Sequence, residues 1–360
     1  MTEPKCAYAT PVFKMNGKVV NSMARDCPRL EIAEGVDGLK TLQLTLAAVG
    51  AGATGPPAPM FYLDGKVLDF GSKISVAVGP DSTQRTVFEG VVSAIEAVFV
   101  DKQPPLVVVS AEDALMRLRM TRRMRTYRKS TDAEIAAEIA GFHGLRSEVD
   151  AEGPRYDLVQ QANQSDLAFL RERARLIRAE LWCSGETLYF KTRTKRRGTK
   201  LTLLQGKDLL NVRLCADLAH QRSDVVVTGY DANTAKGIDE RSGDAITAEV
   251  ASGRTGVAIL KKTFGTSVSL RVRETALTSE EATAFAKAEM LRRARSFVTV
   301  TGMTTGSPDM IVGSTLDLQL VGAPFEGPGY YTVHVRHTFD QTDGLRTHFV
   351  AERATVNEAG

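Results

Sequence analysis

The residues that most often perform catalysis are few in this sequence, and none falls in a recognisable catalytic pattern. The chain has five histidines. His334 and His337 lie three apart in an expected strand, so they point to opposite faces and cannot share a metal ion without a break in that strand. His337 falls on the apolar face, where a histidine that is hydrogen-bonded within the core is the simpler interpretation. There is no nucleophile elbow, Walker loop, dinucleotide-binding glycine motif or H-E-x-x-H zinc motif, and no carboxylate pair lies beside aromatic residues as in a sugar cleft. We therefore predict a protein that is not an enzyme, with no catalytic, cofactor-binding or metal-binding residues.

The cysteines are spread along the chain without a C-x-x-C spacing, at Cys6, Cys27, Cys183 and Cys215. Isolated cysteines of this kind are typical of free, buried thiols in a reducing compartment, and this is our expectation. The alternative is a cross-link to a neighbouring subunit, but nothing in the spacing supports it.

Basic residues gather in two stretches. In the first, Met116, Met120 and Met124 are interleaved with Arg117, Arg119, Arg122, Arg123, Arg125, Arg128 and Lys129. This stretch could contact nucleic acid or an acidic partner, but a helix or strand with a Met/Leu seam and solvated arginines is favoured. The second, Lys191 to Lys200, holds six basic residues and is expected to be a solvated loop, or else a docking surface for an acidic neighbour. The net charge of +3, from 46 basic and 43 acidic residues, does not indicate a nucleic-acid-binding protein.

Length and composition indicate a globular protein of two or three domains, because 360 residues exceed what one ordinary core holds. The N-terminal segment MTEPKCAYATPVF has neither the basic region nor the apolar region of a secretion signal. The longest apolar run, Leu42 to Ala53, reaches about half the length of a membrane span and is interrupted by Thr45, Gly50 and Gly52. We therefore expect no membrane-spanning segment.

The region that organises the chain is Ser307 to Arg353, which has the alternation of three consecutive antiparallel strands. The residues expected on its core-facing side are Leu316, Leu318 and Leu320, then Tyr331, Val333 and Val335, then Leu345, Thr347 and Phe349. Residues that favour turns separate the strands, at Gly322 to Pro324, Gly327 to Gly329 and Asp343-Gly344.

The same order of strand, turn, strand, turn and strand occurs once earlier. The earlier block spans Gly71 to Glu112 and the later one Gly313 to Glu352, and both end in Ala-Glu. Gly90, inside the long second strand, is expected to mark a bulge or bend, and it lies nearly as far from the end of its block as Gly329 does. Two copies of one small β-barrel are favoured over an unrelated pair of meanders. Alternating apolar residues in and before the earlier block are Leu42, Leu44, Leu46, Ile74, Val76 and Val78.

Three helices are expected beside the two blocks. Thr131-x-x-Glu134 is a capping box, and Thr278-x-x-Glu281 is a second one that opens a helix running towards Ser296. Ser165 caps another helix, whose apolar stripe consists of Leu167, Leu170, Ala174, Ile177 and Leu181. Residues 231–256 are polar, Gly-rich and weakly patterned, so we expect a loop or an insertion there.

The segment Tyr156 to Phe190 carries a resemblance to a known family. Its run Gln161-x-Asn163-Gln164-Ser165-Asp166-x-x-Phe169-Leu170-x-x-Arg173 resembles a motif of the phage late control protein D family. These are baseplate hub proteins of contractile tails, related to the hub region of VgrG spike proteins. The family usually has Glu where this chain has Gln164. Further similar stretches are Pro11 to Phe13, Asn16 to Val19, Gly229-Tyr230-Asp231 and Phe325 to Phe339, so the resemblance covers nearly the whole chain.

The resemblance implies an α+β, predominantly β fold. It has two tail-tube-like antiparallel β-barrel domains and a middle α/β domain, assembled as a pseudo-sixfold homotrimeric ring. On this basis the first barrel covers residues 1–112, the middle domain 113–205 with 238–306, and the split second barrel 206–237 with 307–356. Two barrels in each of three subunits would present six similar units to a hexameric tube.

The resemblance further implies the function of a structural baseplate hub, which adapts the hexameric tail tube to a separate trimeric spike and forms part of the central channel. The implied partners are two further copies of the chain, the tail tube or tube-initiator protein, the spike, baseplate wedge proteins and a tape measure protein in the lumen. No specific nucleic acid, membrane or cofactor is implied. The implied location is a virion tail baseplate or an injection particle, assembled in the cytoplasm of a bacterial host.

Other functions remain open on the sequence. The chain stops at Gly360 without repeats that could form a collar or a β-helical needle, which favours a phage or phage-derived tail over a fused secretion spike. The main alternative is the hub of a non-viral contractile injection system, type VI-like or extracellular. A cell-wall hydrolase and a DNA-binding module are less favoured, because no catalytic motif occurs and a channel for DNA or protein should avoid a strongly basic wall.

Overall fold

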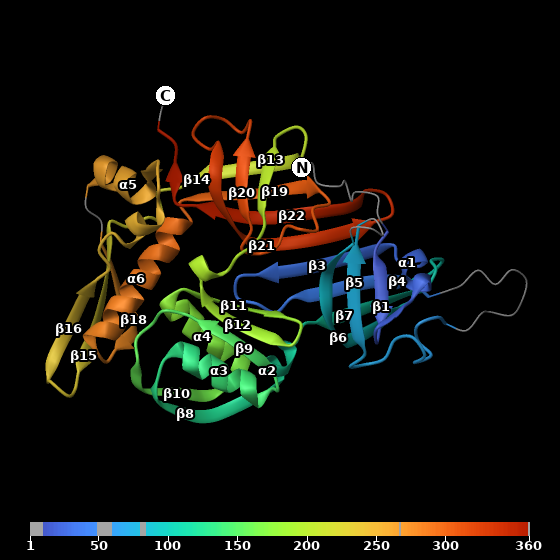
Figure 1. The fold of residues 1–360 in the computed structure, drawn as a ribbon, viewed down its shortest axis with the longest axis horizontal. Coiled ribbons are helices and arrows are strands. Elements are labelled where there is room, and N and C mark those ends of the chain that lie inside the picture. The colour runs from blue at the N-terminus through green and yellow to red at the C-terminus, as the bar shows by residue number, and fades with distance from the viewer. Residues whose placement is uncertain (1–9, 49–59, 80–83, 266–267, 359–360) are drawn as a thin grey trace, which may run out of the picture.

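A computed structural model describes residues 10–48, 60–79, 84–265 and 268–358 of the chain. Strands dominate it, in large antiparallel sheets, as expected. Figure 1 shows two strand-rich units side by side, a mixed unit beneath them and a lateral unit at the left of the view. Cys6, the Gly/Pro loop expected at 50–59 and the turn expected at Pro80-Asp81 lie outside the described residues. Within the described ranges, no helix has the length and apolar character that crossing a membrane requires.

The first β-unit is built from the N-terminal third of the chain. Its elements are β1 (Val12–Met15), β2 (Lys18–Val19), α1 (Asn21–Arg25), β3 (Arg29–Gly35), β4 (Thr41–Ala47), β5 (Lys73–Val78), β6 (Arg85–Val98) and β7 (Leu106–Glu112). The strands follow the order β3-β4-β7-β6-β5-β1-β2, and all of these pairings are antiparallel. The expected alternation is confirmed, because none of six residues exceeds 1% exposure: Leu42, Leu44, Leu46, Ile74, Val76 and Val78.

Gly90 permits the close approach of two strands and is not itself a bulge. A Cβ atom at this position would lie 2.3 Å from the backbone oxygen of Glu112 on β7, so any side chain would force the strands apart. The register of β6 shifts on either side of this residue, at Val87 and at Ser93. The prediction of a bulge in this strand is therefore confirmed, but the predicted position of the bulge is wrong.

The second β-unit combines two separate parts of the chain. Its strands are β13 (Lys200–Leu204), β14 (Leu209–Ala216), β19 (Val298–Thr305), β20 (Thr315–Gln319), β21 (Gly327–Asp340) and β22 (Gly344–Arg353). They follow the order β14-β19-β22-β21-β20-β13, in which only the pairing of β13 with β20 is parallel. Of the residues expected to face the core, the following are buried: Leu316, Leu318, Val335, Leu345, Thr347 and Phe349.

The predicted core-facing side of β21 is wrong in its first half. A bulge at Val333 shifts the register, so that Tyr330 is buried in place of Tyr331. Beyond the bulge Val335 faces the core as expected. Leu320 is also misassigned, because its left-handed backbone (φ 58°) follows the end of β20 and leaves the side chain 65% exposed.

The two β-units repeat each other in register. β6 and β21 both contain 14 residues, and each has a bulge at the corresponding place, Ser93 in β6 and Val333 in β21. On the far side of β7 and β22, β4 corresponds to β19 and β3 to β14. The duplication of strands expected from the sequence is therefore present. The residue pairs that flank the two bulges correspond one to one, Val92–Ala111 to Thr332–Ala351 and Ala94–Ser110 to His334–Val350.

β21 also joins the two β-units, through a pairing that we call the in-chain joint. Its residues 334–340 pair antiparallel with residues 35–29 of β3. The strands of both units thereby form one continuous sheet. Phe339 and Leu345 of the second unit pack into the core of the first, so the joint is supported by side chains as well as by the backbone.

The middle unit begins with α2 (Met116–Met120). It continues with β8 (Arg122–Ser130), α3 (Asp132–Phe142), β9 (Arg146–Asp150), β10 (Tyr156–Ser165), α4 (Asp166–Ile177), β11 (Ala179–Ser184), β12 (Thr187–Thr192) and η2 (Arg193–Lys195). The capping predictions are confirmed: Thr131 and Glu134 form both bonds of the capping box at α3, and Ser165 accepts from the backbone N–H of Ala168 in α4. The predicted stripe is buried at Leu167, Leu170 and Ala174 and half-buried at Ile177. The predicted helix is too long, because α4 ends at Ile177 and the buried Leu181 lies in β11.

The lateral unit comprises β15 (Asp224–Asp231), β16 (Lys236–Arg241), η3 (Ala245–Glu249), β17 (Arg254–Thr255), α5 (Gly256–Phe264), β18 (Val268–Ala276) and α6 (Ser279–Arg295), and β17 pairs with β23 (Thr355–Val356). The helix expected after Thr278 is confirmed as α6, since Thr278 accepts from the N–H of Glu281. The prediction of a loop at residues 231–256 is wrong, because these residues form β16, η3 and β17. Ile238 and Ile246 anchor these elements in the cores, although two isolated apolar residues give no periodic signal.

The sheets divide the chain differently from the domain limits that the resemblance implies. β13 and β19 belong to the sheet of the second β-unit, although they fall outside 206–237 and 307–356. β15 lies inside those limits but pairs with β16 and β18 in the lateral unit. One face of α6 packs into the core of the middle unit through Ala282, Phe285 and Ala286.

Candidate functional site

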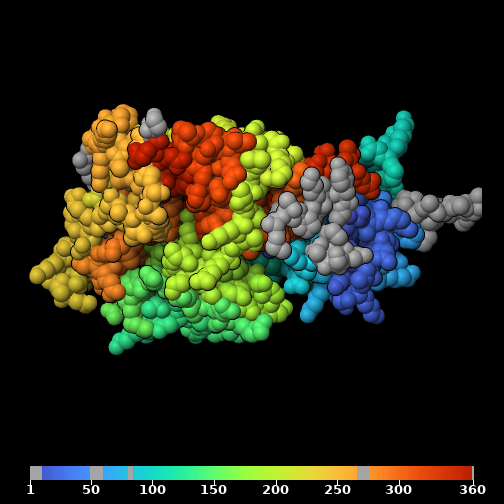
Figure 2. All heavy atoms as spheres, turned by 45° about the horizontal axis from the view of Figure 1, so that its top comes forward, coloured from blue at the N-terminus to red at the C-terminus, as the bar shows by residue number. Residues whose placement is uncertain are grey.

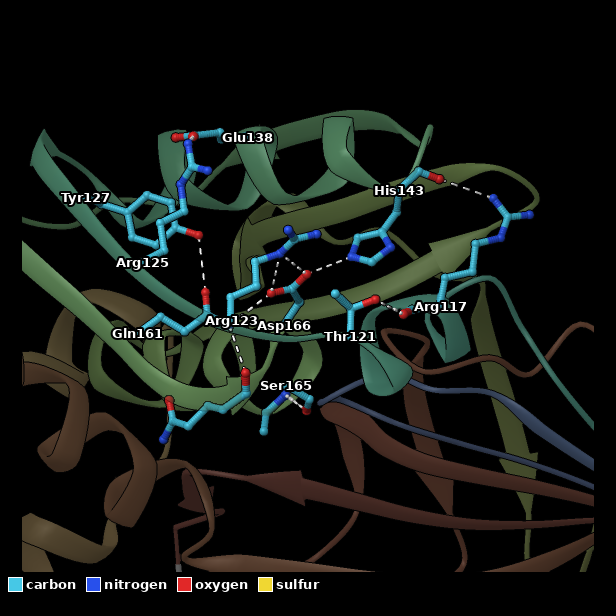
Figure 3. A network of polar contacts seen from close by, with 12 residues as sticks. Arg117, Thr121, Arg123, Arg125, Tyr127, Glu138, His143, Gln161, Ser165 and Asp166 are labelled. Carbon is cyan, nitrogen blue, oxygen red and sulfur yellow. Dashed lines mark hydrogen bonds and ion pairs between the residues drawn. The ribbon is translucent and has the colours of Figure 1, made fainter.

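The family-like motif at residues 161–173 forms a buried polar cluster (Figure 3). Asp166, the first residue of α4, is fully buried, and three side chains converge on its carboxylate. Arg123 Nε lies 2.8 Å from Oδ2, His143 Nε2 lies 2.7 Å from the same oxygen, and Gln161 Nε2 donates to Oδ1 at 2.9 Å. These residues come from β8, the end of α3 and β10. One carboxylate therefore fixes three elements against the N-terminus of α4, where a negative charge is favourable.

Arg173 of the same motif holds a second buried carboxylate. Its Nε lies 2.5 Å from Asp132 Oδ1, and the hydroxyl of Tyr156 donates to Asp132 Oδ2 at 2.9 Å. The guanidinium group lies 4.3 Å from the centre of the Tyr156 ring. Asp132 begins α3 as Asp166 begins α4, so both buried carboxylates position helices. Both carboxylates are held by side chains from other elements of the same unit.

The first basic stretch is largely occupied by contacts within the chain. Met120 and Met124 are 68% and 72% exposed, so the predicted Met/Leu seam is wrong for these two methionines. Leu118 of α2 is buried as such a seam requires, and Tyr127 of β8 supplies a further buried position. Four of the arginines pair with acidic residues, namely Arg117 with Glu186, Arg119 with Glu112, Arg123 with Asp166 and Arg125 with Glu138. These pairs neutralise much of the charge that a nucleic acid would contact.

The second basic stretch forms a buried ion network between the units, which we call the junction network. Arg193 and Arg196 are 9% and 7% exposed, and both contact Glu180 of β11. Arg196 also pairs with Glu34 of the first β-unit at 2.6 Å, and Arg193 pairs with Glu352 of the second at 2.5 Å. The expectation of a solvated loop is wrong for these two arginines. They connect the middle unit to both β-units.

Aromatic rings complete the junction network. The guanidinium of Arg196 lies 4.3 Å from the centre of the Trp182 ring, and that of Arg193 lies 4.1 Å from the centre of the Tyr331 ring. The hydroxyl of Tyr331 donates to Glu180 at 2.8 Å. Buried charges are tolerated where they are paired and hydrogen-bonded, and these contacts meet that condition.

The charge state of Glu34 follows from the same contacts. Burial opposes its ionisation, but Lys40 and Arg196 outweigh burial and hold the pKa of this carboxyl below its usual range. Beside the network is an open depression of about 700 Å³, lined in part by Arg197 and Lys200. Figure 2 shows the yellow-green segment that holds this stretch running between the green middle unit and the red second β-unit.

The two histidines of β21 point to opposite faces, as predicted. His334 is exposed, whereas His337 is 6% exposed and its Nδ1 lies 3.0 Å from the hydroxyl of Thr347. Burial lowers the pKa of His337 to about 4, so the ring is neutral in the folded protein near pH 7. Among the residues that the structure describes, no group of three His, Cys, Asp or Glu side chains is placed to hold a metal ion.

The burial of His337 predicts a loss of stability in mild acid. The unfolded chain takes up a proton on this residue below about pH 6.5, whereas the folded protein does so only near pH 4. Stability should therefore fall as the pH is lowered between these values, by up to about 3 kcal/mol from this group. Urea unfolding of His337→Gln should show a smaller fall over this range than the unsubstituted chain. Equal pH profiles would show that His337 is not responsible.

The cysteines only partly match the prediction of free buried thiols. Cys27 and Cys183 are buried and free, and burial raises the pKa of each thiol to about 12. Cys215 on β14 is free but exposed, so the prediction is wrong for this residue.

Sequence reasoning missed the acidic members of the junction network and the role of His143. One signal was present: Glu34 shares the core-facing side of its strand with Leu30 and Ile32. A carboxylate on an apolar face indicates a buried ion pair. The partners of this carboxylate could not be identified, because Arg196 lies far along the chain in an irregular segment.

Comparisons with known proteins place this fold among phage tail proteins. A family model described as the Alg8 N-terminal domain matches residues 31–341. The 43 kDa tail protein of prophage MuSo2 from Shewanella oneidensis is similar with a TM-score of 0.68 and 15% identity, over 96% of this chain and 98% of that chain. The tail protein from Neisseria meningitidis is similar with a TM-score of 0.66 and 11% identity, over 96% of each chain. No curated protein sequence matches.

A secretion protein shares the fold as well. It is an E. coli component of the type VI secretion system, described as structurally similar to the T4 bacteriophage tail proteins gp27 and gp5. Its TM-score is 0.59 at 13% identity, over 97% of this chain and 79% of that chain. At these identities the similarity shows the fold, and at that level it confirms the resemblance to tail proteins.

Proposed function

Since this chain belongs to the Alg8 N-terminal domain family and has the fold of phage tail proteins, we propose that it is a structural baseplate hub of a contractile tail. In this role it adapts a hexameric tail tube to a separate trimeric spike and lines part of the central channel. Its partners are two further copies of the chain, the tube or tube-initiator protein, the spike, wedge proteins and a tape measure protein. It acts in the baseplate of a virion or injection particle, assembled in a bacterial cytoplasm.

The observation that carries this proposal is the in-register repeat of the first β-unit in the second. Two similar units in each chain become six in a trimer, which suits a sixfold tube, and a ring of such units needs equal rotations between neighbours. We set the limits of the second barrel by its strands, at 200–216 with 298–353. The first barrel ends at 112, and the middle and lateral units occupy the remainder.

The alternative is the hub of a non-viral contractile injection system, and the similarity to the E. coli type VI secretion component favours it. Both readings give the chain the same architectural role and differ in the spike and tube that it binds. A hydrolase or a DNA-binding module is less favoured, because the buried carboxylates of Asp132 and Asp166 position helices. In addition, four arginines of the first basic stretch are paired with acidic residues. A peptidoglycan-clearing assay should show no activity.

The assembly state tests the proposed function. Light scattering of the purified chain, alone and with its spike, should give the mass of three copies. The same measurement in high salt should leave the trimer largely intact if strand pairing and apolar contacts hold it together. A chain that stays monomeric both alone and with the spike would contradict the role of a symmetry adaptor.

A further inference from the structure

Two segments of the continuous sheet each have an open strand edge. β14 pairs with β19 on one side, and residues 94–98 of β6 pair with β7 on one side. In the part of the chain that the structure describes, no strand pairs with the other side of either segment. Figure 1 shows β14 in the upper β-unit and β6 in the β-unit to its right. Open edges of this kind are the usual sites for pairing with another chain.

The repeat identifies these edges as the two halves of a second joint. β6 corresponds to β21 and β14 corresponds to β3, and β21 and β3 already pair within the chain. The correspondence extends to single residues. The strand pairings match β6 to β21, so that Glu96 corresponds to Arg336 and Phe99 corresponds to Phe339. They also match β14 to β3, so that Arg213 corresponds to Glu31.

We propose that β6 of one copy pairs antiparallel with β14 of the next copy, in the register of the in-chain joint. The proposal rests on the proposed trimer and specifies its interface. Glu96 of one copy then lies directly opposite Cys215 of the next, Ala97 opposite Leu214, and Phe99 opposite Val212. The ring contains in-chain joints and joints between copies in alternation, so that all six β-units are linked in the same way.

The charges on the two edges support this register. Across the in-chain joint, Arg336 lies 3.7 Å from Glu31, a residue diagonally opposite it. The corresponding residues on the open edges are Glu96 and Arg213, which are both exposed. Relative to the in-chain joint, the charge on each strand has the opposite sign, so Glu96 and Arg213 are again an oppositely charged pair. The same diagonal contact can form between copies, with the carboxylate on β6 and the guanidinium on β14.

Burial supports the same interface. Phe339 is 7% exposed at the in-chain joint, whereas its counterpart Phe99 is 64% exposed. Leu30 and Ile32 of β3 are at most 2% exposed, while the corresponding Val212 and Leu214 of β14 are only partly buried. The apolar residues that the in-chain joint covers are therefore present on the open edges as well, and strand pairing between copies would cover them.

A disulfide provides a direct test of the register. Directly opposite residues of antiparallel strands have Cα atoms about 4.5–5.5 Å apart, within the range that a disulfide spans. Under mild oxidation, the variant Glu96→Cys should therefore form a disulfide between residue 96 of one copy and Cys215 of the next copy. Two controls should stay unlinked: Glu96→Cys combined with Cys215→Ser, and Glu89→Cys, which lies on the half of β6 that pairs with β5.

Charge reversal provides a second test that needs no thiol chemistry. Glu96→Arg and Arg213→Glu should each raise the concentration at which half of the trimer dissociates, by roughly fivefold or more. The double variant should restore the original value. Suppose that the chain is a trimer but Glu96→Cys forms no disulfide with Cys215 and the double charge variant restores nothing. This result would overturn the proposed strand pairing and leave the proposed hub function standing. A chain that is monomeric even with its spike would overturn both.

Discussion

Replacing Arg196 with methionine is expected to lower the free energy of unfolding by about 3–5 kcal/mol. The guanidinium of Arg196 pairs with Glu34 and Glu180 and donates to the backbone oxygen of Val312. Methionine fills a similar volume but leaves both carboxylates without this buried partner. The loss should appear as a lower urea midpoint with an unchanged slope, because only the stability of the native state changes.

Lys195 offers a matched control from the same stretch. It pairs with Asp150 at 2.8 Å, but both side chains are about half exposed. Surface pairs of this kind contribute little, so Lys195→Met should cost less than about 1 kcal/mol. If the two substitutions have equal effects, the junction network does not hold the units together.

Replacing Asp166 with alanine is expected to cost about 3 kcal/mol or more, because it leaves buried partners unsatisfied. Arg123, His143 and Gln161 all contact this carboxylate, and the ring of His143 is almost entirely buried. Alanine also removes the negative charge from the first turn of α4. Thermal or urea unfolding would measure the effect, and proteolysis should become faster in the middle unit.

Glu138 serves as the control for Asp166. It pairs with Arg125 in the same unit, but 40% of its side chain is exposed. Glu138→Ala should therefore change the free energy of unfolding by less than about 1 kcal/mol. A large loss for Glu138→Ala with a small one for Asp166→Ala would show that the buried cluster is not what stabilises the unit.

Much of the fold could be predicted because strands and helix starts leave local signals. Leu42, Leu44 and Leu46 alternate without interruption, and they are all buried. Thr131 and Ser165 cap helices at the predicted positions. Both kinds of signal depend only on near neighbours in the chain, through the two-residue period of a strand and the free N–H groups of a helix start.

The failures came from features that depend on distant contacts. The bulge at Val333 reverses a face of β21, and nothing in the local alternation marks it. Its counterpart at Ser93 becomes visible only when the two β-units are aligned by their strand pairs. The solvated appearance of Arg193 and Arg196 likewise reflects composition alone, since their partners come from three other elements.

The candidate site shows the same division. The resemblance pointed to Gln161, Asp166 and Arg173, and the structure gives each a buried partner. Their chemistry could not be read from the motif, because a buried carboxylate in a catalytic cluster and one in a structural cluster have the same sequence. The partners Arg123 and His143 could not be identified from the motif either, because they lie in other elements.

The reversed charges of Arg336 and Glu31 relative to Glu96 and Arg213 would also sort correct neighbours from incorrect ones. If β6 of one chain met β3 of another, Glu96 would face Glu31. If β21 met β14, Arg336 would face Arg213. Each mistaken contact brings like charges together, and such repulsion is a recognised source of specificity. Two similar β-units in one polypeptide could then assemble in strict alternation around a ring, without a template to order them.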